Sequence, residues 1–436
     1  MPAELGDNPF MKIWKGTVLG AFFWWLLGLN LFFYHLVAGL LFLGILFVAA
    51  KNPKGLFLPS SFFFLLLLSA IYAFSILIHA SASDFSRVLA AFYNLSFWLM
   101  GLMLVVILAN TFTFSQIPSL LKVFYSVAWF SGLLALAVMG IWFSGTRSFI
   151  FPTPLYGLTN WLGHTTLVET TLMVRLLLVD WFASFTRPRF NLFSPYPTAA
   201  GGILMILLTM LLVRFFIDKK INKPLFIFLF LSNLLGLVMT LSRISLLALA
   251  LSLAWVFFIQ RKHFPLWIFL SLGVLVLALP ALEKFTQYFL ELREGSTLTR
   301  WDLYQYSLDQ LEGVDWILGL GVKPRGQAFE FPLGSHSTYL SLLFKTGVTG
   351  LVTLGTFHAS LFFRWYRLKS LLREDRQMFY LWQGLGMIFF AMAIWMLTED
   401  IDAPQLLAFL YFSFVGIFEG LRRNLLDGKT LSPSVA

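Results

Sequence analysis

The sequence predicts an all-α fold, a polytopic integral membrane helical bundle of about 12 transmembrane helices with two long periplasmic segments. Two observations carry this prediction. Of the 436 residues, 59% are hydrophobic and only 12% are charged, whereas soluble globular chains carry about 25% charged residues. The apolar runs also recur almost from end to end, each close to the roughly 20 residues that a helix needs to cross a bilayer. We therefore expect residues 1–436 to form a single membrane domain.

The expected spans follow directly from these apolar runs. Stretch 16–50 is too long for one span and suits two short helices with a break near Gly28–Asn30. The other predicted spans are 60–79, 92–112, 118–142, 196–217, 224–240, 244–259, 264–282, 337–363, 378–397 and 405–421.

The positive charges predict the orientation, because Lys and Arg favour cytoplasmic loops. With the N-terminus in the cytoplasm, every short basic loop falls on that side, as does the C-terminus. The periplasmic side then receives the acidic stretch "TEDID" at 398–402 and two long segments, 143–195 and 283–335. Part of 143–195 could also dip back into the bilayer. This asymmetry accounts for the net charge of +10 without a nucleic-acid partner.

The large periplasmic loop, 283–335, contains a predicted amphipathic helix near 299–312. Thr297 or Thr299 can cap its start, and Gly313 stands where a glycine after the last turn belongs. The face that we expect to be buried carries Trp301, Tyr304, Leu308 and Leu311. We expect this helix to lie across the outer mouth of the bundle.

The periplasmic side collects arginines, although outer loops are normally poor in Lys and Arg. The set comprises Arg147, Arg175, Arg187, Arg189, Arg243, Arg293, Arg300 and Arg325. Because the planar guanidinium suits bidentate binding of phosphate, Arg189, Arg243 and Arg300 predict an anionic ligand. The alternatives are contact with lipid headgroups or pairing with acidic residues, namely Glu283, Glu291, Glu294 or Asp302.

His336 heads an apolar helical run in which Gly347 and Gly350 follow. Ser335 is the predicted cap, which places His336 in the first turn, where the positive helix end disfavours imidazolium. A neutral imidazole can accept a proton near pH 7; the alternative is a histidine hydrogen-bonded to a loop carbonyl. The other histidines form no HExxH motif and no P-loop is present, so we expect no metal, nucleotide or other cofactor.

The motif around His336 resembles the bacterial O-antigen ligase family, part of a larger group with O-antigen polymerases and O-linked oligosaccharyltransferases. The family signature is His, then Asn, Ser or Gln, nine residues, Gly, two residues, and Gly, Thr or Tyr. Here it is His336-Ser337, nine residues from Thr338 to Thr346, Gly347, two residues and Gly350.

Three further stretches are similar to family patterns: "TLSRISLL" with Arg243, "TRWDLYQYSL" followed by "LGLG" with Arg300, and "RPRFNLFSPYPTAAGGIL" with Arg187 and Arg189. The chain departs from the family at two positions. Thr198 stands where an Asn commonly ends the third stretch, which leaves the choice between Arg187 and Arg189 open. Lys345 stands two residues before the motif glycine, where an acidic residue is frequent.

The resemblance implies an O-antigen ligase, a glycosyltransferase of lipopolysaccharide biosynthesis in the bacterial inner membrane. Such an enzyme moves a glycan from undecaprenyl pyrophosphate to a sugar hydroxyl of lipid A–core, at the periplasmic face, with inversion and without metal or nucleotide. The implied roles are proton removal by His336, pyrophosphate binding by Arg189, Arg243, Arg300 or Arg187, and structural motif positions at Ser337, Gly347 and Gly350.

Two other functions remain open from the sequence. A polysaccharide polymerase would use the same lipid-linked donor and a second lipid-linked glycan as the acceptor. A transporter of lipid-linked sugars, from a different class, is expected to carry polar residues near mid-bilayer and repeated halves. The sequence shows few charges at the centres of its spans and no obvious internal repeat.

Overall fold

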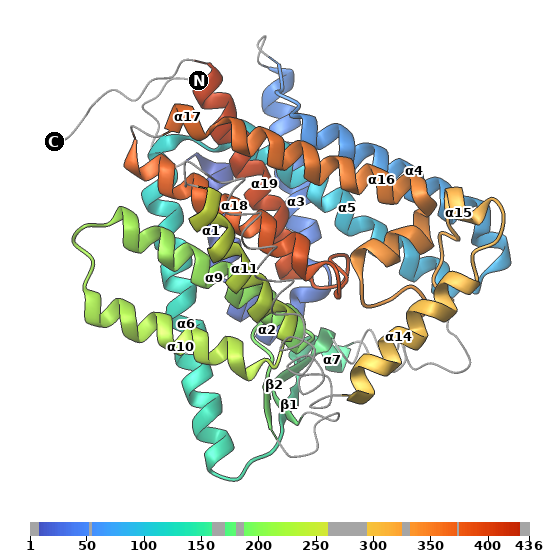
Figure 1. Ribbon diagram of the computed structural model, residues 1–436, viewed down its shortest axis with the longest axis horizontal. Coiled ribbons are helices and arrows are strands. Elements are labelled where there is room, and N and C mark those ends of the chain that lie inside the picture. Colours follow the sequence, from blue (N-terminus) through green and yellow to red (C-terminus); the bar gives the residue numbers. More distant parts are fainter. Residues whose placement is uncertain are drawn as a thin grey trace, which may run out of the picture.

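The structure is a computed structural model that describes residues 8–51, 55–158, 171–179, 187–259, 294–324, 332–372 and 375–427. Helices dominate it (Figure 1). Eight helices of the described chain are long and apolar enough to cross a membrane. They are α3 (Phe33–Ala50), α4 (Ser60–His79), α5 (Phe85–Thr111), α6 (Ile117–Phe143), α9 (Pro197–Ile217), α16 (Thr338–Arg367), α18 (Arg376–Trp395) and α19 (Gln405–Leu426). The predicted class, an all-α polytopic membrane protein, is confirmed.

The other helical elements are shorter. They are α1 (Pro9–Leu19), α2 (Ala21–Leu27), η1 (Leu29–Leu31), η2 (Ala80–Ala82), η3 (Phe114–Gln116), α7 (Pro154–Leu158), α10 (Lys223–Met239), α11 (Arg243–Ile259), α14 (Glu294–Asp309), α15 (Asp315–Leu318) and α17 (Lys369–Leu372). The predicted span 264–282 lies outside the described residues, so the total of about 12 spans stays a prediction.

The break that the sequence predicts near Gly28–Asn30 is present. Gly28 ends α2 with a left-handed backbone (φ +79°), and a single 3-10 turn, η1, leads into α3. A Cβ atom at Gly28 would collide with the side chain of Thr153. Glycine is therefore needed here both for the backbone angle and for the close approach.

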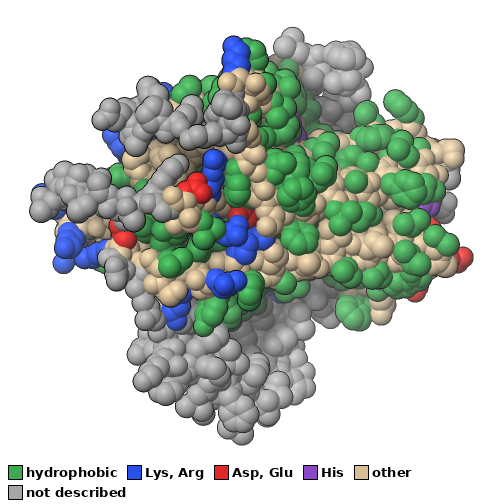
Figure 2. Space-filling model, turned by 90° about the horizontal axis from the view of Figure 1, so that it is seen from above, with side chains coloured by type: hydrophobic (Ala, Val, Ile, Leu, Met, Phe, Trp, Pro, Cys, Tyr) green, Lys and Arg blue, Asp and Glu red, His purple; other side chains and the backbone are tan. Residues whose placement is uncertain are grey.

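Helix ends from distant parts of the chain meet at one end of the bundle. The Ser61 hydroxyl donates to Glu419 (2.6 Å), Arg364 pairs with the same carboxylate (3.0 Å), and Arg423 donates to Asn110 (2.8 Å). These contacts join the start of α4 to the ends of α5, α16 and α19. Figure 2 shows the molecule from above, where Lys and Arg side chains gather on one half of a largely hydrophobic face. This is the end that the charge pattern predicts to be cytoplasmic.

The opposite end of the bundle carries a three-stranded antiparallel sheet, near the bottom of Figure 1. Its strands are β1 (Phe149–Pro152), β2 (Met173–Val179) and β3 (Pro188–Phe190), with Leu178 of β2 opposite Arg189 of β3. The sequence analysis predicted 143–195 as a long periplasmic segment and did not anticipate the sheet. Strands this short leave little period-2 pattern to detect.

α19 packs closely against α5, because two glycines one turn apart let the backbones approach. A Cβ atom at Gly416 would lie 2.9 Å from the Leu104 carbonyl oxygen, and one at Gly420 would lie 2.9 Å from the Leu108 carbonyl oxygen. The spacing is the small-xxx-small pattern typical of membrane helix pairs. It places α19 in the core, with nearly all of its residues buried.

α16 is broken inside its length at Gly347, where the backbone is non-helical (φ 64°, ψ −167°). The turn after α15 docks into this break: Leu320 N–H donates to Phe344 O (2.8 Å) and Gly321 N–H to Lys345 O (3.0 Å). A Cβ atom at Gly347 would collide with the backbone of Ile317. The motif glycine thus permits contact between two main chains.

Candidate active site

α14 runs from Glu294 to Asp309, so it begins earlier than predicted, and Thr297 and Thr299 lie inside it rather than at its cap. Trp301 is 60% exposed, and its assignment to the buried face was wrong. The buried positions are Leu311, as predicted, and Leu303 and Ser307, which the prediction did not include. A core of Leu303, Leu311, Leu333 and Phe344 holds the helix against the first part of α16. Arg300 and Tyr304 are thereby directed toward His336.

His336 has a left-handed backbone (φ +66°), which is uncommon for a residue with a side chain. The surrounding structure holds it there. The Tyr304 hydroxyl donates to the His336 carbonyl oxygen (2.5 Å), and Gly334, also left-handed, donates its N–H to the Ser307 hydroxyl (2.8 Å). Such backbone strain, fixed by neighbours, concentrates at functional sites.

The cap of α16 is Ser337 rather than Ser335 as predicted. The Ser337 hydroxyl accepts a hydrogen bond from Leu340 N–H (3.3 Å), and α16 begins at Thr338. His336 therefore precedes the cap and lies outside the first turn. The serine of the His-Ser pair is explained by the need for a short oxygen-bearing side chain at the cap.

Replacing Ser337 by Ala is expected to destabilise the protein by about 1 kcal/mol, because the cap acceptor for Leu340 N–H is lost. The measurement is the thermal unfolding midpoint of the purified protein in detergent. Ser337→Asn, which keeps a cap acceptor, is the matched control and should remain close to wild type. A Ser337→Ala midpoint equal to that of wild type would contradict the assignment of the cap.

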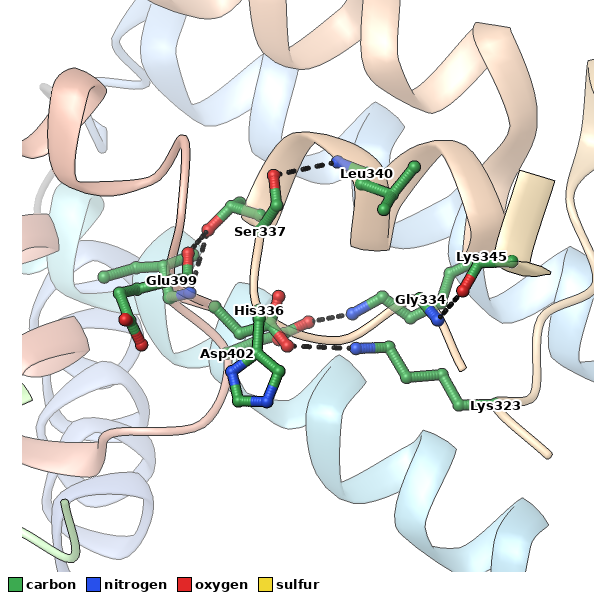
Figure 3. A network of polar contacts seen from close by, with 12 residues as sticks. Lys323, Gly334, His336, Ser337, Leu340, Lys345, Glu399 and Asp402 are labelled. Atoms are coloured by element: carbon green, nitrogen blue, oxygen red, sulfur yellow. Dashed lines mark hydrogen bonds and ion pairs between the residues drawn. The ribbon is translucent and has the colours of Figure 1, made fainter. Parts of the chain in front are cut away.

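The segment 398–402, between α18 and α19, is tied to the start of α16. Thr338 N–H donates to Met396 O (2.9 Å) and to Glu399 O (3.0 Å). The Thr338 hydroxyl donates to Glu399 O (2.7 Å) and accepts from Ile401 N–H (3.0 Å). The residues next to His336 therefore fix the position of this acidic segment, and Figure 3 shows Glu399 beside the start of α16.

A cavity of about 320 Å³ lies at the end of the bundle opposite the basic face. Its lining comes from β3, from the start of α9, from α14, from the segment before α16 and from the end of α18 with the acidic segment. The lining residues are Arg189, Tyr196, Pro197, Thr198, Thr299, Arg300, Ser335, His336, Trp395, Glu399, Asp400, Ala403 and Pro404. Three residues predicted from sequence, Arg189, Arg300 and His336, thus share one cavity.

The other predicted arginines are placed differently. Arg187 precedes β3 and Arg243 begins α11, directly after α10 as predicted, but neither lines the cavity. The structure therefore places Arg189 rather than Arg187 at the cavity wall. Arg293 and Arg325, together with Glu283 and Glu291, lie outside the described residues.

Arg300 contacts an acidic residue that the sequence analysis did not consider. Its guanidinium pairs with Glu399 (2.9 Å) and donates to Thr398 O (3.2 Å). Thr198 donates to the other Glu399 oxygen (2.9 Å), so the residue that replaces the common Asn still supplies a hydrogen-bond donor. Burial opposes the charge of Arg300, but Glu399 outweighs it and raises the pKa of Arg300 above its ordinary value.

His336 is neutral in this environment. Burial is the main cause that lowers the pKa of His336 to about 4, and the positive charges of Arg300 and Lys323 lower it further, against the opposing effect of Glu399. The sequence analysis also expected a neutral imidazole, but it gave the helix end as the cause. The structure replaces that cause with burial and the neighbouring cations.

Asp400 is a further cavity residue that the sequence analysis missed. One of its oxygens accepts from Lys323 Nζ (3.1 Å), and its buried Oδ1 has no hydrogen-bond partner in the part of the chain that the structure describes. Burial raises the pKa of Asp400, although Lys323 acts against this. The available signal was the "TEDID" stretch itself, three acidic residues in a short connection between two spans. It was used only to assign a side of the membrane.

The described residues contain no group of three His, Cys, Asp or Glu side chains placed to hold a metal ion. Fold and cavity together define a polytopic membrane protein with a charged cavity, lined by arginines, carboxylates and one histidine, at one end of its helical bundle. Residues 225–355 match the family model described as O-antigen ligase. The matched stretch contains Arg243, Arg300 and the whole His336–Gly350 motif. No curated protein matches the chain.

Proposed function

We propose that the protein is an O-antigen ligase of the bacterial inner membrane. It transfers a glycan from undecaprenyl pyrophosphate to a sugar hydroxyl of lipid A–core, and it needs neither metal nor nucleotide. The reaction takes place at the periplasmic face, and both chain termini are cytoplasmic. The observation that carries this proposal is the cavity that holds Arg189, Arg300 and His336 together.

The two arginines on the cavity wall suit the diphosphate of the donor. Guanidinium groups bind phosphate oxygens through paired N–H donors, and Arg189 and Arg300 approach from different elements, β3 and α14. Positive groups fixed in advance stabilise the charge that develops on a leaving diphosphate. The bilayer around the helical bundle supplies the polyprenyl tail with an apolar phase.

His336 suits proton removal from the acceptor. As the hydroxyl oxygen forms its bond to the anomeric carbon, the bond from that carbon to the diphosphate oxygen breaks, and the hydroxyl proton passes to the imidazole. Attack opposite the leaving group inverts the anomeric centre. An anionic donor beside Arg300 offsets the positive charge that lowers the pKa of His336 in the unliganded protein. Donor binding therefore makes His336 a stronger base.

Asp400 suits the orientation of the acceptor sugar. Asp400 lines the same cavity as Glu399, and its buried Oδ1 has no hydrogen-bond partner among the described residues, although a buried carboxylate oxygen requires a donor. A sugar hydroxyl supplies such a donor. We assign to Asp400 a hydrogen bond to the acceptor sugar, which aligns the attacking hydroxyl with His336.

Arg300→Lys is expected to lower kcat/KM for the donor by about 10-fold to 100-fold, because an ammonium cannot reproduce the planar fork. In the structure that fork reaches both Glu399 and the Thr398 carbonyl. Initial rates at varied donor concentration measure the effect. Arg243→Lys, at a position outside the cavity lining, is the comparison and should retain more activity. If Arg243→Lys lost more activity than Arg300→Lys, the diphosphate would instead be assigned to the start of α11.

The decisive experiment is a transfer assay with purified protein in liposomes, lipid-linked glycan and lipid A–core, without added nucleotide or metal. Glycan on lipid A–core supports the ligase. Longer lipid-linked chains without modified acceptor would identify a polymerase, and the absence of any covalent product would favour transport. A requirement for metal, tested with a chelator, would contradict the proposed mechanism.

A further inference from the structure

Lys345 forms an ion pair inside the protein, close to the cavity but not in its wall. Its side chain is fully buried, and its Nζ pairs with Asp402, whose side chain is 4% exposed. The Trp98 indole N–H also donates to Asp402 (3.2 Å), and the Tyr72 ring lies 5.1 Å from the ammonium. A charge buried this deeply is tolerated only with such partners.

Asp402 belongs to the acidic segment whose preceding residues line the cavity. Glu399 and Asp400 face the cavity, Ile401 is buried in the core, and Asp402 is directed to Lys345. A second cation holds the same segment, since Lys323 pairs with Asp400 (3.1 Å). Figure 3 shows Lys323 and Lys345 on the same side of the acidic segment and His336 beside it.

Lys345 is also fixed through its main chain. Its carbonyl oxygen accepts from Gly321 N–H (3.0 Å), within the turn that fills the break of α16. The Lys323 carbonyl oxygen, two residues further along that turn, accepts from Arg87 Nε (2.7 Å). The main chains of both lysines that hold the acidic segment are therefore fixed by hydrogen bonds to other segments.

We propose that Lys345 is a positioning residue for the transfer reaction: through Asp402 it fixes the 398–402 segment so that Glu399 and Asp400 face the cavity, and its charge favours ionised Asp400. This inference rests on the proposed function for its kinetic consequence. Lys345 does not contact the cavity, so it acts only through the carboxylates.

The ionisation of Asp400 depends on charges from several elements. Burial raises its pKa, Lys323 lowers it, Asp402 raises it and Lys345 lowers it. Arg300, Tyr304, Tyr196, Tyr72 and Glu399 are further charged or titratable groups near Asp400, and Arg189 and His336 line the same cavity. Removing the charge of Lys345 leaves Asp402 uncompensated beside Asp400. The loss of the Lys345 charge and the uncompensated charge of Asp402 both favour protonated Asp400. The pKa of Asp400 therefore rises when Lys345 is replaced.

The test uses Lys345→Met in the full-length protein, with kcat, KM and the pH profile of transfer measured in liposomes. We expect kcat to fall about 10-fold to 100-fold, as for a misplaced reacting group. On the acid side of the profile, the acid limb, the pH at which activity falls to half should rise by about half a unit to one unit. Lys345→Arg, which keeps the charge, should retain the wild-type acid limb. Lys15→Met removes another buried lysine, one that donates to Ser119 at the opposite end of the bundle, and should change neither kcat nor the limb.

Infrared titration of the buried carboxyl band gives a second readout that needs no catalysis, with Asp400→Asn to assign the band. An upward shift in Lys345→Met supports the proposal, and an unchanged titration in folded protein overturns it.

If Lys345→Met does not fold, Asp402→Asn and the reversed pair Lys345→Asp with Asp402→Lys take its place. Recovery of folding but not of kcat in the reversed pair supports positioning, whereas recovery of wild-type kcat and pH profile makes the pair merely structural. A wild-type protein without transferase activity would remove the proposed function, and the infrared titration would still decide the role of Lys345.

Discussion

His336→Ala abolishes glycan transfer while leaving the protein folded: this is the largest functional effect that we expect. The imidazole lies in the cavity wall with Arg189 and Arg300, and among the described lining residues it is the sole histidine. Loss of a positioned base costs about 100-fold to 10,000-fold in rate. The effect should appear in kcat, measured as glycan joined to lipid A–core per unit time.

His79→Ala is the matched control for this variant. His79 lies at the same end of the bundle, on α4, and its ring is 3.5 Å from Asp315 rather than in the cavity. It should keep wild-type transfer. Substantial transfer by His336→Ala, at more than about a tenth of the wild-type rate, would sink the assignment of His336 as the base.

The pH dependence gives an independent check on the same histidine. Because the pKa of His336 is lowered to about 4 in the unliganded protein, the imidazole is neutral and able to accept a proton at any pH well above that value. The base form is lost only as the pH falls through the lowered pKa. We therefore expect that His336 contributes no decrease in kcat/KM, which reports the free enzyme, between pH 7 and about pH 5.5. A histidine with an ordinary pKa would lose most of its base form over this range.

Gly347→Ala is expected to have the largest effect on folding. Its φ of +64° is strained for alanine, at a cost of order 1–3 kcal/mol. In addition, the new methyl group would meet the backbone of Ile317, which cannot rotate away as a side chain can. We expect little folded protein, measured as monodisperse yield in detergent and as the thermal unfolding midpoint.

Gly355→Ala provides the comparison, because Gly355 lies in the same helix and a Cβ atom there meets nothing within 4 Å. This variant should fold as well as wild type or slightly better, since alanine favours helix over glycine by about 1 kcal/mol. If both variants behaved alike, the close approach of α15 to the break in α16 would be wrong.

The helices that cross the membrane were predictable because each is encoded by its own run of apolar residues. Even the break at Gly28 was visible, since the apolar stretch around it was too long for one helix. Sequence patterns could not reveal contacts between distant segments. The pairs Arg300 with Glu399 and Lys345 with Asp402 each join residues that are far apart in the chain. Only the packing of α14, α16 and the 398–402 segment brings them together.

The errors near His336 have a related physical cause. Ser335 and Ser337 are equally good cap residues by type, and the difference is decided by the Thr338 contacts with Glu399 and Ile401. Trp301 was assigned to the buried face because it is apolar, but the adjoining core of Leu333 and Phe344 selects Leu303 instead. Arg243 lies between two helices as expected, but the cavity is lined by Arg189 and Arg300 and not by Arg243.

Under the proposed function, the break at Gly347 also bears on the depth of the site in the bilayer. From Val348 to Arg367 the second piece of α16 has about 20 residues, or roughly 30 Å, which equals the thickness of the hydrocarbon core. The first piece, Thr338–Thr346, is then left for the headgroup layer, where Lys345 and Thr346 are tolerable. A lipid-linked substrate carries its diphosphate in that same layer. Under the proposed function, Gly347 would thus hold His336 level with the polar end of a lipid, rather than above it in bulk water.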